Sequence, residues 1–382
     1  MAKKGLQYKL AFVFLILILA GTLTACAGGT ATPTTPKPTT PTAPATSPTA
    51  TPTIPKPTTS PSPSPSPTPT ATAKPVTWRL ASDFPLGTFV SDTEIKFMDE
   101  VTRRSNGLIK FDYFPGAALY KSTELWPALQ DGRIEAIHSA SEYGSSEVPV
   151  LGCIAIPITF LDEAHAQRAA EGDWGKELIR ITEEHFTNIK VVGCGSMGAA
   201  YGVGKGNPIL VPSDMKARKM RCSGKPQSLF FGSQGAIVIT MSSSELSMAF
   251  ERGTIDATVT TVSRIASQFK GIVDWVVLVP WTISPLDFIM VSRSAFNALA
   301  PELQKVVLEG GKAAQDWSLT AVTQRNKDDV EKARAMGMKI YPLTPEQLKQ
   351  WFDVSEKYVL PELLKDWGAA GERLWALAQK YR

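Results

Sequence analysis

A tract of Thr, Pro, Ala and Ser runs from Gly29 to about Pro75 and contains almost no residue able to build a hydrophobic core. Segments this poor in apolar side chains bury too little surface to offset the entropy of ordering. The tract therefore confines any globular fold to residues 76–382. Proline-rich chain extends by roughly 3 Å per residue, so we expect a tether that can reach on the order of 100 Å.

Residues 1–25 have the layout of a secretory signal peptide. Lys3, Lys4 and Lys9 precede the apolar run "LAFVFLILILA", and small residues follow it. The run is too short to span a bilayer as a stable helix, but its length is typical of a signal peptide. We therefore expect the protein to be exported.

Cys26 ends the tetrapeptide "LTAC", which resembles the lipobox of bacterial lipoproteins. The resemblance implies that Cys26 carries a lipid and that residues 26–75 form a lipidated Thr/Pro-rich tether. The protein would then be extracytoplasmic and lipid-anchored at the cell membrane, in the periplasm or on the outer face of the cytoplasmic membrane. The alternative is an ordinary cleaved signal peptide followed by an incidental cysteine.

The charge of the chain depends on where it is counted. The sequence has 40 Lys and Arg against 36 Asp and Glu, but six lysines and no acidic residue precede residue 75. The remainder carries 34 basic and 36 acidic residues, a net charge of −2. A nearly neutral domain argues against a nucleic-acid partner, because such partners require a basic surface.

Cysteine and histidine are too few and too scattered for a disulfide framework or a metal site. Three cysteines remain in the domain, an odd number that allows at most one disulfide, and three histidines lie apart from them. We therefore expect no metal and no cofactor. These residues are Cys153, Cys194, Cys222, His138, His165 and His185.

The start of the domain alternates strand and helix patterns. Residues 76–82 and 108–114 read as strands, and the helix between them is expected to begin at Ser91 or Asp92 and to stop at Gly107. Its inward face is expected to contain Ile95, Met98 and Val101. This order predicts parallel α/β packing, in which ligand crevices open beyond the carboxyl ends of the strands. We also expect helices at 122–132 and 162–186, strands at 189–195, 219–222, 236–240 and 256–261, and a Thr344–Gln347 capping box before the C-terminal helices.

Several blocks resemble solute-binding proteins of TRAP transporters, the tripartite ATP-independent periplasmic family (DctP-like). They are "LASDFPLGT", "VTRRSNGLIKFDYFPGAALYKSTELWPALQDGRIEA", "PSDMKARKMR", "QGAIVITMSSSELSMAFERGTIDA" and "SPLDFIMVSRSAFNALAPELQKVV". They occur in the order and spacing typical of that family, and the match as a whole extends over essentially all of residues 76–382. The resemblance implies an α/β fold, a two-lobed periplasmic-binding-protein-like clamp with a long lobe-spanning helix near residues 301–336. Lobe I would hold about 76–198 and 286–325, and lobe II about 199–285 and 326–382.

The same resemblance implies a function without catalysis. Such proteins capture a small organic acid and deliver it to membrane permease subunits driven by an ion gradient. A sensor that presents its ligand to a signalling receptor is the alternative within the same fold, and a neighbouring histidine-kinase gene instead of permease genes would favour it. A secreted enzyme is the alternative from another class, and turnover of a bound ligand would identify it.

The basic stretch "DMKARKMR" ends in Arg221, where the family pattern places an arginine that binds the substrate carboxylate. Arg221 also closes an expected strand, just before a Ser-Gly turn, which is where an α/β crevice would lie. Guanidinium pairs bidentately with carboxylate, which an ammonium group does not reproduce. We expect Lys216, Arg218 and Lys219 to form a solvated edge.

Spacing relative to the family implies further pocket residues. Tyr201 stands twenty residues before Arg221, where many carboxylate-binding relatives have a second arginine, and this favours a monocarboxylate. Ordinary packing is the alternative for each aromatic residue. The remaining candidates are Thr260, Trp281, Phe84, Glu142, Tyr143 and Ser243.

Gly193, Gly195 and Gly198 match the G-x-G-x-x-G pattern of dinucleotide sites. The helix that such a site requires is not expected, because "AAYGVGKGNPILVP" is rich in glycine and proline. Ser196 lacks the surroundings of a nucleophile, since Cys194 stands where a nucleophile elbow needs glycine. We therefore expect the glycines to let the chain cross between lobes.

Overall fold

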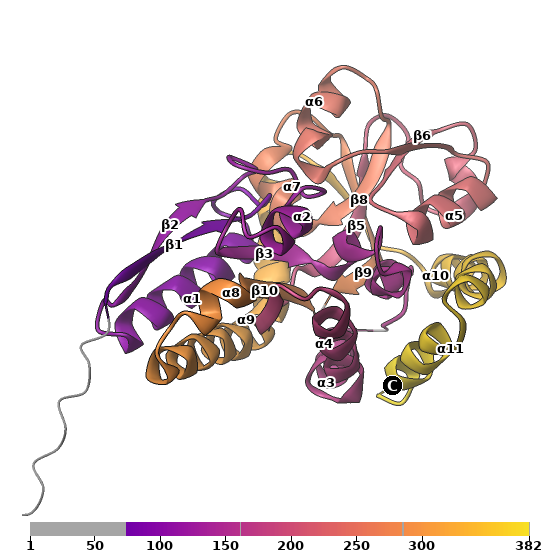
Figure 1. Ribbon diagram of the computed structural model, residues 1–382. Coiled ribbons are helices and arrows are strands. Elements are labelled where there is room, and N and C mark those ends of the chain that lie inside the picture. The colour runs from indigo at the N-terminus through magenta and orange to yellow at the C-terminus, as the bar shows by residue number, and fades with distance from the viewer. Residues whose placement is uncertain (1–73, 161, 285, 382) are drawn as a thin grey trace, which may run out of the picture. The chain divides into compact units, whose positions relative to one another are not determined.

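The computed structural model describes residues 74–160, 162–284 and 286–381 (Figure 1). Residues 1–25, Cys26 and nearly all of the Thr/Pro-rich tract lie outside this part, so the expectations for them stay predictions. Among the residues described, none of the helices combines the length and the apolar character that crossing a membrane requires. The described strands form two sheets, and each sheet is the centre of one lobe.

The first lobe is built on five strands: β1 (Val76–Ala81), β2 (Ile109–Phe114), β3 (Ala136–Ala140), β4 (Ile189–Gly195) and β10 (Asp287–Ser292). Their order in the sheet is β2-β1-β3-β10-β4. β1 pairs in parallel with β2 and β3, whereas β10 runs antiparallel to β3 and β4. The expected parallel start of the domain is therefore confirmed, and a late strand completes the sheet.

The second lobe is built on six strands: β5 (Gly198–Gly204), β6 (Lys219–Cys222), β7 (Ile237–Thr240), β8 (Ala257–Thr261), β9 (Trp275–Ser284) and β11 (Lys339–Tyr341). Their order is β11-β9-β5-β8-β6-β7. The chain enters this sheet between β4 and β5 and leaves it between β9 and β10. The crossing from β4 to β5 lies at Gly193, Gly195 and Gly198, the glycines expected to let the chain cross between lobes.

The first long helix, α1 (Phe89–Arg104), begins earlier than expected. Thr88 is its N-cap, and the hydroxyl of Thr88 accepts a hydrogen bond from the Ser91 backbone N–H at 3.2 Å. Ser91 and Asp92, the expected caps, therefore lie in the first turn. Of the three residues expected to face inward, Val101 is buried, Met98 is half-buried and Ile95 is exposed. The buried stripe runs through Val90, Glu94, Phe97 and Val101.

The helix expected over 162–186 is divided at Gly172 into α3 (Glu163–Glu171) and α4 (Asp173–His185). A Cβ atom on Gly172 would lie 2.2 Å from the ring of Tyr381, so the C-terminus approaches too closely for a side chain here. The helix expected over 122–132 is the shorter α2 (Leu125–Gln130). The other short helical elements are η1 (Ser141–Gly144), η2 (Pro149–Ala155), η3 (Pro212–Met215), α5 (Lys225–Ser233), η4 (Ser243–Glu245), α6 (Leu246–Glu251), α7 (Val262–Gln268) and α8 (Arg293–Asn297).

The long helix expected near 301–336 is α9 (Pro301–Ala335). It packs against α1 and β4 of the first lobe, and against α7, β5 and β11 of the second. In Figure 1 it lies beside α1 and α8 beneath the first sheet. One rigid element thus contacts both sheets.

The C-terminal helices contact different lobes. The capping box of Thr344 and Gln347 begins α10 (Pro345–Val354), which packs on η3 as part of the second lobe. The π-helical turn η5 (Ser355–Val359) then leads into α11 (Leu360–Gln379), which packs on α4 and η2. The expectation placed all of 326–382 in the second lobe; α11 contacts α4 beside the first sheet, and its Asp366 also pairs with Lys225 of α5 in the second lobe.

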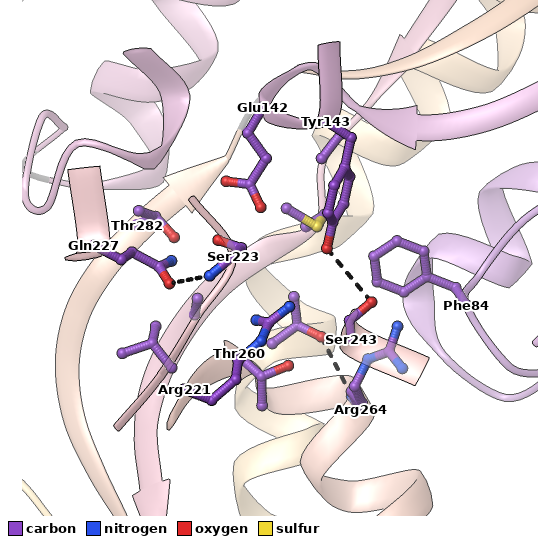
Figure 2. A pocket seen from close by; sticks show the side chains of 15 residues that line it. Phe84, Glu142, Tyr143, Arg221, Ser223, Gln227, Ser243, Thr260, Arg264 and Thr282 are labelled. Carbon is purple, nitrogen blue, oxygen red and sulfur yellow. Dashed lines mark hydrogen bonds between the residues drawn. The ribbon is translucent and has the colours of Figure 1, made fainter. Parts of the chain in front are cut away.

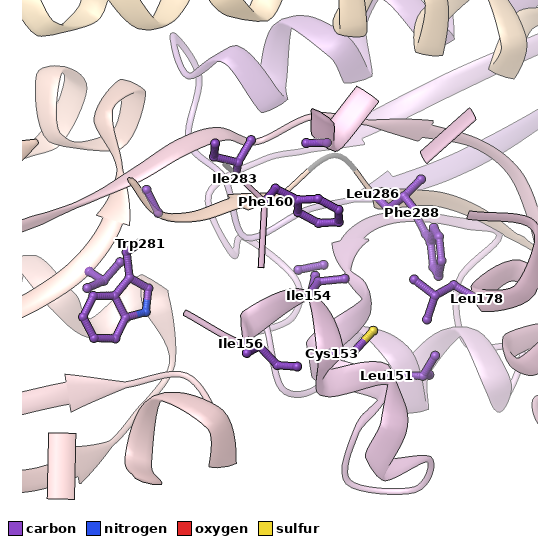
Figure 3. Close-up of a cluster of buried hydrophobic side chains, with 14 of the residues drawn as sticks. Leu151, Cys153, Ile154, Ile156, Phe160, Leu178, Trp281, Ile283, Leu286 and Phe288 are labelled. Carbon is purple, nitrogen blue, oxygen red and sulfur yellow. The ribbon is translucent and has the colours of Figure 1, made fainter. Parts of the chain in front are cut away.

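Buried apolar side chains from both lobes form one continuous cluster (Figure 3). Leu151 and Ile154 of η2 and Leu178 of α4 belong to it, together with Trp281 and Ile283 of β9. Burial of apolar surface is the main force that holds elements together. This cluster joins the lobes on the side of η2 and β9.

Candidate solute-binding site

A cavity lies between the lobes, where the carboxyl ends of strands from both sheets meet. It offers about 50 Å³ to the centres of water-sized molecules. On this measure one water requires roughly 10–15 Å³, so the site suits a small solute. Six of the eight expected pocket residues line it: Phe84, Glu142, Tyr143, Arg221, Ser243 and Thr260 (Figure 2).

Arg221 is buried at the end of β6, with 3% of its surface exposed. Its Nε and Nη2 both donate to the Met241 carbonyl oxygen, at 3.0 and 2.8 Å. Two donors on one oxygen fix the plane of the guanidinium. Nη1 has no hydrogen-bond partner in the described part of the chain. Arg221 therefore presents an oriented cation to the cavity.

The other basic residues of this stretch have different surroundings. Lys216 is exposed, as expected. Arg218 is half-buried and donates to the Lys205 carbonyl oxygen at 2.8 Å, and Lys219 Nζ lies 3.7 Å from Asp256 Oδ1. The expectation of a solvated edge is thus wrong for Arg218 and Lys219, because both bind neighbouring loops of the second lobe.

Arg264 of α7 is a second guanidinium at the cavity, and it is already paired. Its Nη2 lies 3.2 Å from Asp83 Oδ2, and its Nη1 donates to Gln268 Oε1 at 3.2 Å. The guanidinium also stacks over the Phe84 ring, 4.7 Å from the centroid. Burial lowers the pKa of Arg264, and the charge of Asp83 opposes this effect. Ser243 Oγ donates to the same Asp83 carboxylate.

Carboxyl and phenol groups on the first-lobe side sit in a desolvating environment. Burial raises the pKa of Glu142, and the positive charge of Arg221 opposes the shift. Burial likewise raises the pKa of Tyr143, whose hydroxyl lies 3.5 Å from Ser243 Oγ. Asp287 is fully buried at the start of β10, and burial raises its pKa well above the ordinary value.

Trp281 does not reach the cavity. It is completely buried and packs against Phe230, with ring centroids 4.4 Å apart, and against Trp351 at 5.3 Å. Its neighbour Thr282 lines the cavity instead. Successive residues of a strand face opposite sides of the sheet. The expected residue, Trp281, is one position away from the residue that lines the cavity, so its side chain lies in the core.

Tyr201 also misses the cavity, for the same reason. Ala200 lines the cavity, while Tyr201 lines a separate groove with Glu163 and Asn326. Burial raises the pKa of Tyr201 to about 12. The argument for a monocarboxylate that rested on Tyr201 therefore has no support from its position.

Sequence reasoning missed several residues of the site. Asp83 follows β1 by two residues and Arg264 follows β8 by three, so the rule that crevices open at carboxyl ends could have found both. Gln227 and Thr282 carry no comparable signal, because one lies inside a helix and the other inside a strand. The missed lining residues with polar side chains are Ser223, Gln227, Thr261, Arg264 and Thr282.

The glycine pattern serves packing at the crossing between lobes. β5 follows β4 directly, so the helix of a dinucleotide site is absent at this position. A Cβ atom on Gly193 would lie 2.6 Å from the Gly311 carbonyl oxygen in α9, and one on Gly198 would lie 2.3 Å from Asn326 Oδ1. The glycines thus let α9 pass close to the crossing.

The cysteines of the domain are free and buried: Cys153, Cys194 and Cys222. Throughout residues 74–160, 162–284 and 286–381, His, Cys, Asp and Glu form no cluster of three or more that could hold a metal ion. The chemistry of the cavity is therefore that of guanidinium, carboxyl, hydroxyl and amide groups.

Two sheet-centred lobes, a helix that spans them and a small polar cavity at the strand ends define a two-lobed solute-binding protein. The profile of the bacterial extracellular solute-binding protein family 7, DctP, matches residues 85–364. The chain belongs to this family, and the resemblance expected from the sequence blocks is confirmed at that level.

Individual relatives are distant in sequence but similar over most of their length. A solute-binding protein of Albidiferax ferrireducens is 26% identical over 319 residues, which cover 79% of this chain and 90% of the relative. A TRAP periplasmic solute-binding protein of Rhodoferax ferrireducens with bound malonate has a TM-score of 0.72 at 24% identity, over 79% of this chain and 97% of that one. The sugar acid binding protein of Advenella mimigardefordensis in complex with galactonate has a TM-score of 0.75 at 21% identity, over 81% and 99%.

Proposed function

We propose that this protein captures a small organic acid through its carboxylate and delivers it to the membrane permease subunits of a TRAP-type secondary transporter. The observation that carries the proposal is Arg221, a buried guanidinium that lines the cavity and is held in one orientation by Met241. Buried charges require a partner, and carboxylate is the group that guanidinium pairs with best. Relatives of the same fold bind malonate and galactonate, both of which are carboxylates.

The proposal includes an N-terminal lipid on Cys26, which would keep the clamp near the membrane. Small residues before the cysteine and the long Thr/Pro-rich tract after it support this part. Replacing Cys26 with Ser should release the protein from the membrane fraction or leave an uncleaved precursor. A variant that stays processed and acylated would contradict the anchor without affecting the proposed binding site.

A ligand screen followed by substitution of Arg221 tests the binding proposal. A solute at a hundred times its dissociation constant should stabilise the protein by about 2.7 kcal/mol, which a thermal-shift screen of organic acids detects. Removing one partner of a buried ion pair costs about 3–5 kcal/mol, so Arg221→Ala should weaken binding by a hundred-fold to several thousand-fold. Arg221→Lys should also bind weakly, because it keeps the charge but loses the planar fork.

Lys216→Ala is the matched control, since Lys216 belongs to the same basic stretch but is exposed. Calorimetry should show an affinity close to that of the unchanged protein. Retention of tight binding by Arg221→Ala would remove the carboxylate contact from the proposal. Comparable losses in both variants would indicate a diffuse basic patch instead of a site.

A further inference from the structure

The cavity contains two guanidinium groups, but only one is available to a solute. Arg264 donates to the Asp83 carboxylate and to the Asp83 carbonyl oxygen, and its charge is matched by that carboxylate. Within the described residues, the hydrogen bonds of Arg221 go to the neutral carbonyl of Met241 and not to a carboxylate. A solute therefore meets one guanidinium that has no carboxylate hydrogen-bonded to it among the described residues, which is enough for one carboxylate.

A carboxyl group lies opposite this cation. Glu142 belongs to η1 of the first lobe, whereas Arg221 belongs to β6 of the second, and both line the cavity. Figure 2 shows the Glu142 carboxyl group pointing into the cavity from above, with Ser223 and then Arg221 below it in this view. A desolvated carboxylate is unfavourable unless a hydrogen-bond donor or a cation reaches it. The far end of the cavity thus favours a donor and disfavours a second anion.

We propose that the solute is a monocarboxylate with a hydroxyl or ammonium group at the end opposite its carboxylate, and that Glu142 selects this donor and excludes dicarboxylates. The inference rests on the proposed function, because Arg221 must hold the carboxylate for Glu142 to meet the other end. The Asp83 carboxylate, which is paired with Arg264 at the wall of the cavity, adds negative charge that acts on Glu142. Like charges brought together in a desolvated site oppose binding.

The surroundings of Glu142 agree with this assignment. Burial raises its pKa, so the ionised form gains most from a donor that arrives with the solute. The small volume of the cavity favours short acids, in which one molecule contacts both Arg221 and Glu142. The fold itself does not impose the choice, because its relatives bind a dicarboxylate, malonate, and a hydroxylated monocarboxylate, galactonate.

Calorimetry with matched acids tests the inference. The acids are unbranched chains of three to six carbons, and the end opposite the carboxylate is varied among methyl, hydroxyl, ammonium and carboxylate at a single fixed pH of about 8. At the chain length that fits, the hydroxyl or the ammonium acid should bind at least tenfold more tightly than the methyl acid. The diacid should bind at least tenfold more weakly than the methyl acid. The tighter of the two donors identifies the solute class.

Glu142→Gln assigns the selectivity to one side chain, because it keeps the size and one acceptor oxygen but removes the charge. The diacid should gain at least tenfold in affinity and the ammonium acid should lose at least tenfold, while the hydroxyl acid changes less. Glu147→Gln is the matched control, since Glu147 is exposed just beyond η1. Glu142→Asp, which shortens the side chain but keeps the charge, should still exclude diacids and provides a second variant.

The outcomes separate this inference from the proposed function. Two results would overturn the selectivity: diacids that bind the unchanged protein as tightly as the hydroxyl acid, or an order of affinities that Glu142→Gln leaves unchanged. Loss of binding in Arg221→Ala would still support the carboxylate site in either case. Uptake of a proton on tight malonate binding would also overturn it, because Glu142 would then act as a donor. Failure of every acid to bind would overturn both.

Discussion

Arg264 Nη2 lies 3.2 Å from Asp83 Oδ2, and these two buried residues belong to different lobes. Asp83 follows β1 of the first sheet, and Arg264 lies in α7, which follows β8 of the second. Ser122 and Ser242 make a further contact between the lobes, with their hydroxyl oxygens 2.8 Å apart. The structure therefore shows the clamp closed, with an ion pair at the wall of its cavity.

The Asp83–Arg264 pair should show strong coupling in unfolding experiments. Removing one partner of a buried ion pair leaves an unpaired charge and costs about 3–5 kcal/mol, whereas replacing both partners with apolar residues is often close to neutral. We expect Asp83→Leu and Arg264→Met each to lower the free energy of unfolding in urea by this amount. The double variant should lose far less than the sum of the two.

The exposed pair of Lys349 and Asp353 in α10 provides the control for this cycle. Pairs four residues apart on a helix surface contribute only about 0.3–0.5 kcal/mol. Additive losses for Asp83→Leu and Arg264→Met, with a coupling no larger than that of the surface pair, would show that the contact does not hold the lobes together.

Asp287 should make stability fall as the pH rises. Burial raises its folded-state pKa well above the unfolded value near 4, so folding favours the protonated form. The stabilisation is complete below about pH 4 and decreases as the pH increases toward the folded-state pKa. Asp287→Asn should therefore raise the free energy of unfolding at pH 7 to 8, and this gain should disappear at pH 4. Melting curves across this range, with the exposed Asp112→Asn as control, should show the difference; parallel profiles would contradict it.

Trp281 and Thr282 should separate stability from binding, although they are adjacent in β9. Trp281 is buried among Phe230 and Trp351, so Trp281→Ala should cost about 3–5 kcal/mol of unfolding free energy. Thr282 lines the cavity, so Thr282→Ala should mainly change the affinity for the solute. Urea unfolding and calorimetry on both variants measure the two effects. If Trp281→Ala folds stably but binds the solute much more weakly, Trp281 contributes to solute binding after all.

The sequence predicted the elements well where local patterns determine them. The strand at 219–222 and the capping box at Thr344 carry their own signals in turn residues and periodicity, and the structure confirms both. The start of α1 was misjudged, because Thr88, Ser91 and Asp92 are all good caps and only the backbone path selects among them.

The site was predictable to the extent that it follows strand ends. Arg221, Glu142 and Ser243 follow from that rule or from the family resemblance, and all three line the cavity. Trp281 and Tyr201 were assigned by spacing alone, and in a strand one position separates the cavity from the core. The pairing of Arg264 with Asp83 depends on how the lobes meet, which no local pattern encodes.

Gly311 in the middle of α9 should be intolerant of even one methyl group. Helix propensity alone favours Gly311→Ala by about 1 kcal/mol. However, the added Cβ atom would lie 1.9 Å from the Val192 carbonyl oxygen in β4, and a backbone atom cannot move aside as a side chain does. Overpacking of this kind costs about 1–3 kcal/mol or more, so the steric effect should win and Gly311→Ala should unfold at lower urea concentration. Thr320→Ala, at an exposed position of the same helix, should change stability little and in the favourable direction. An increase in stability for Gly311→Ala would mean that α9 does not pack on β4 this closely.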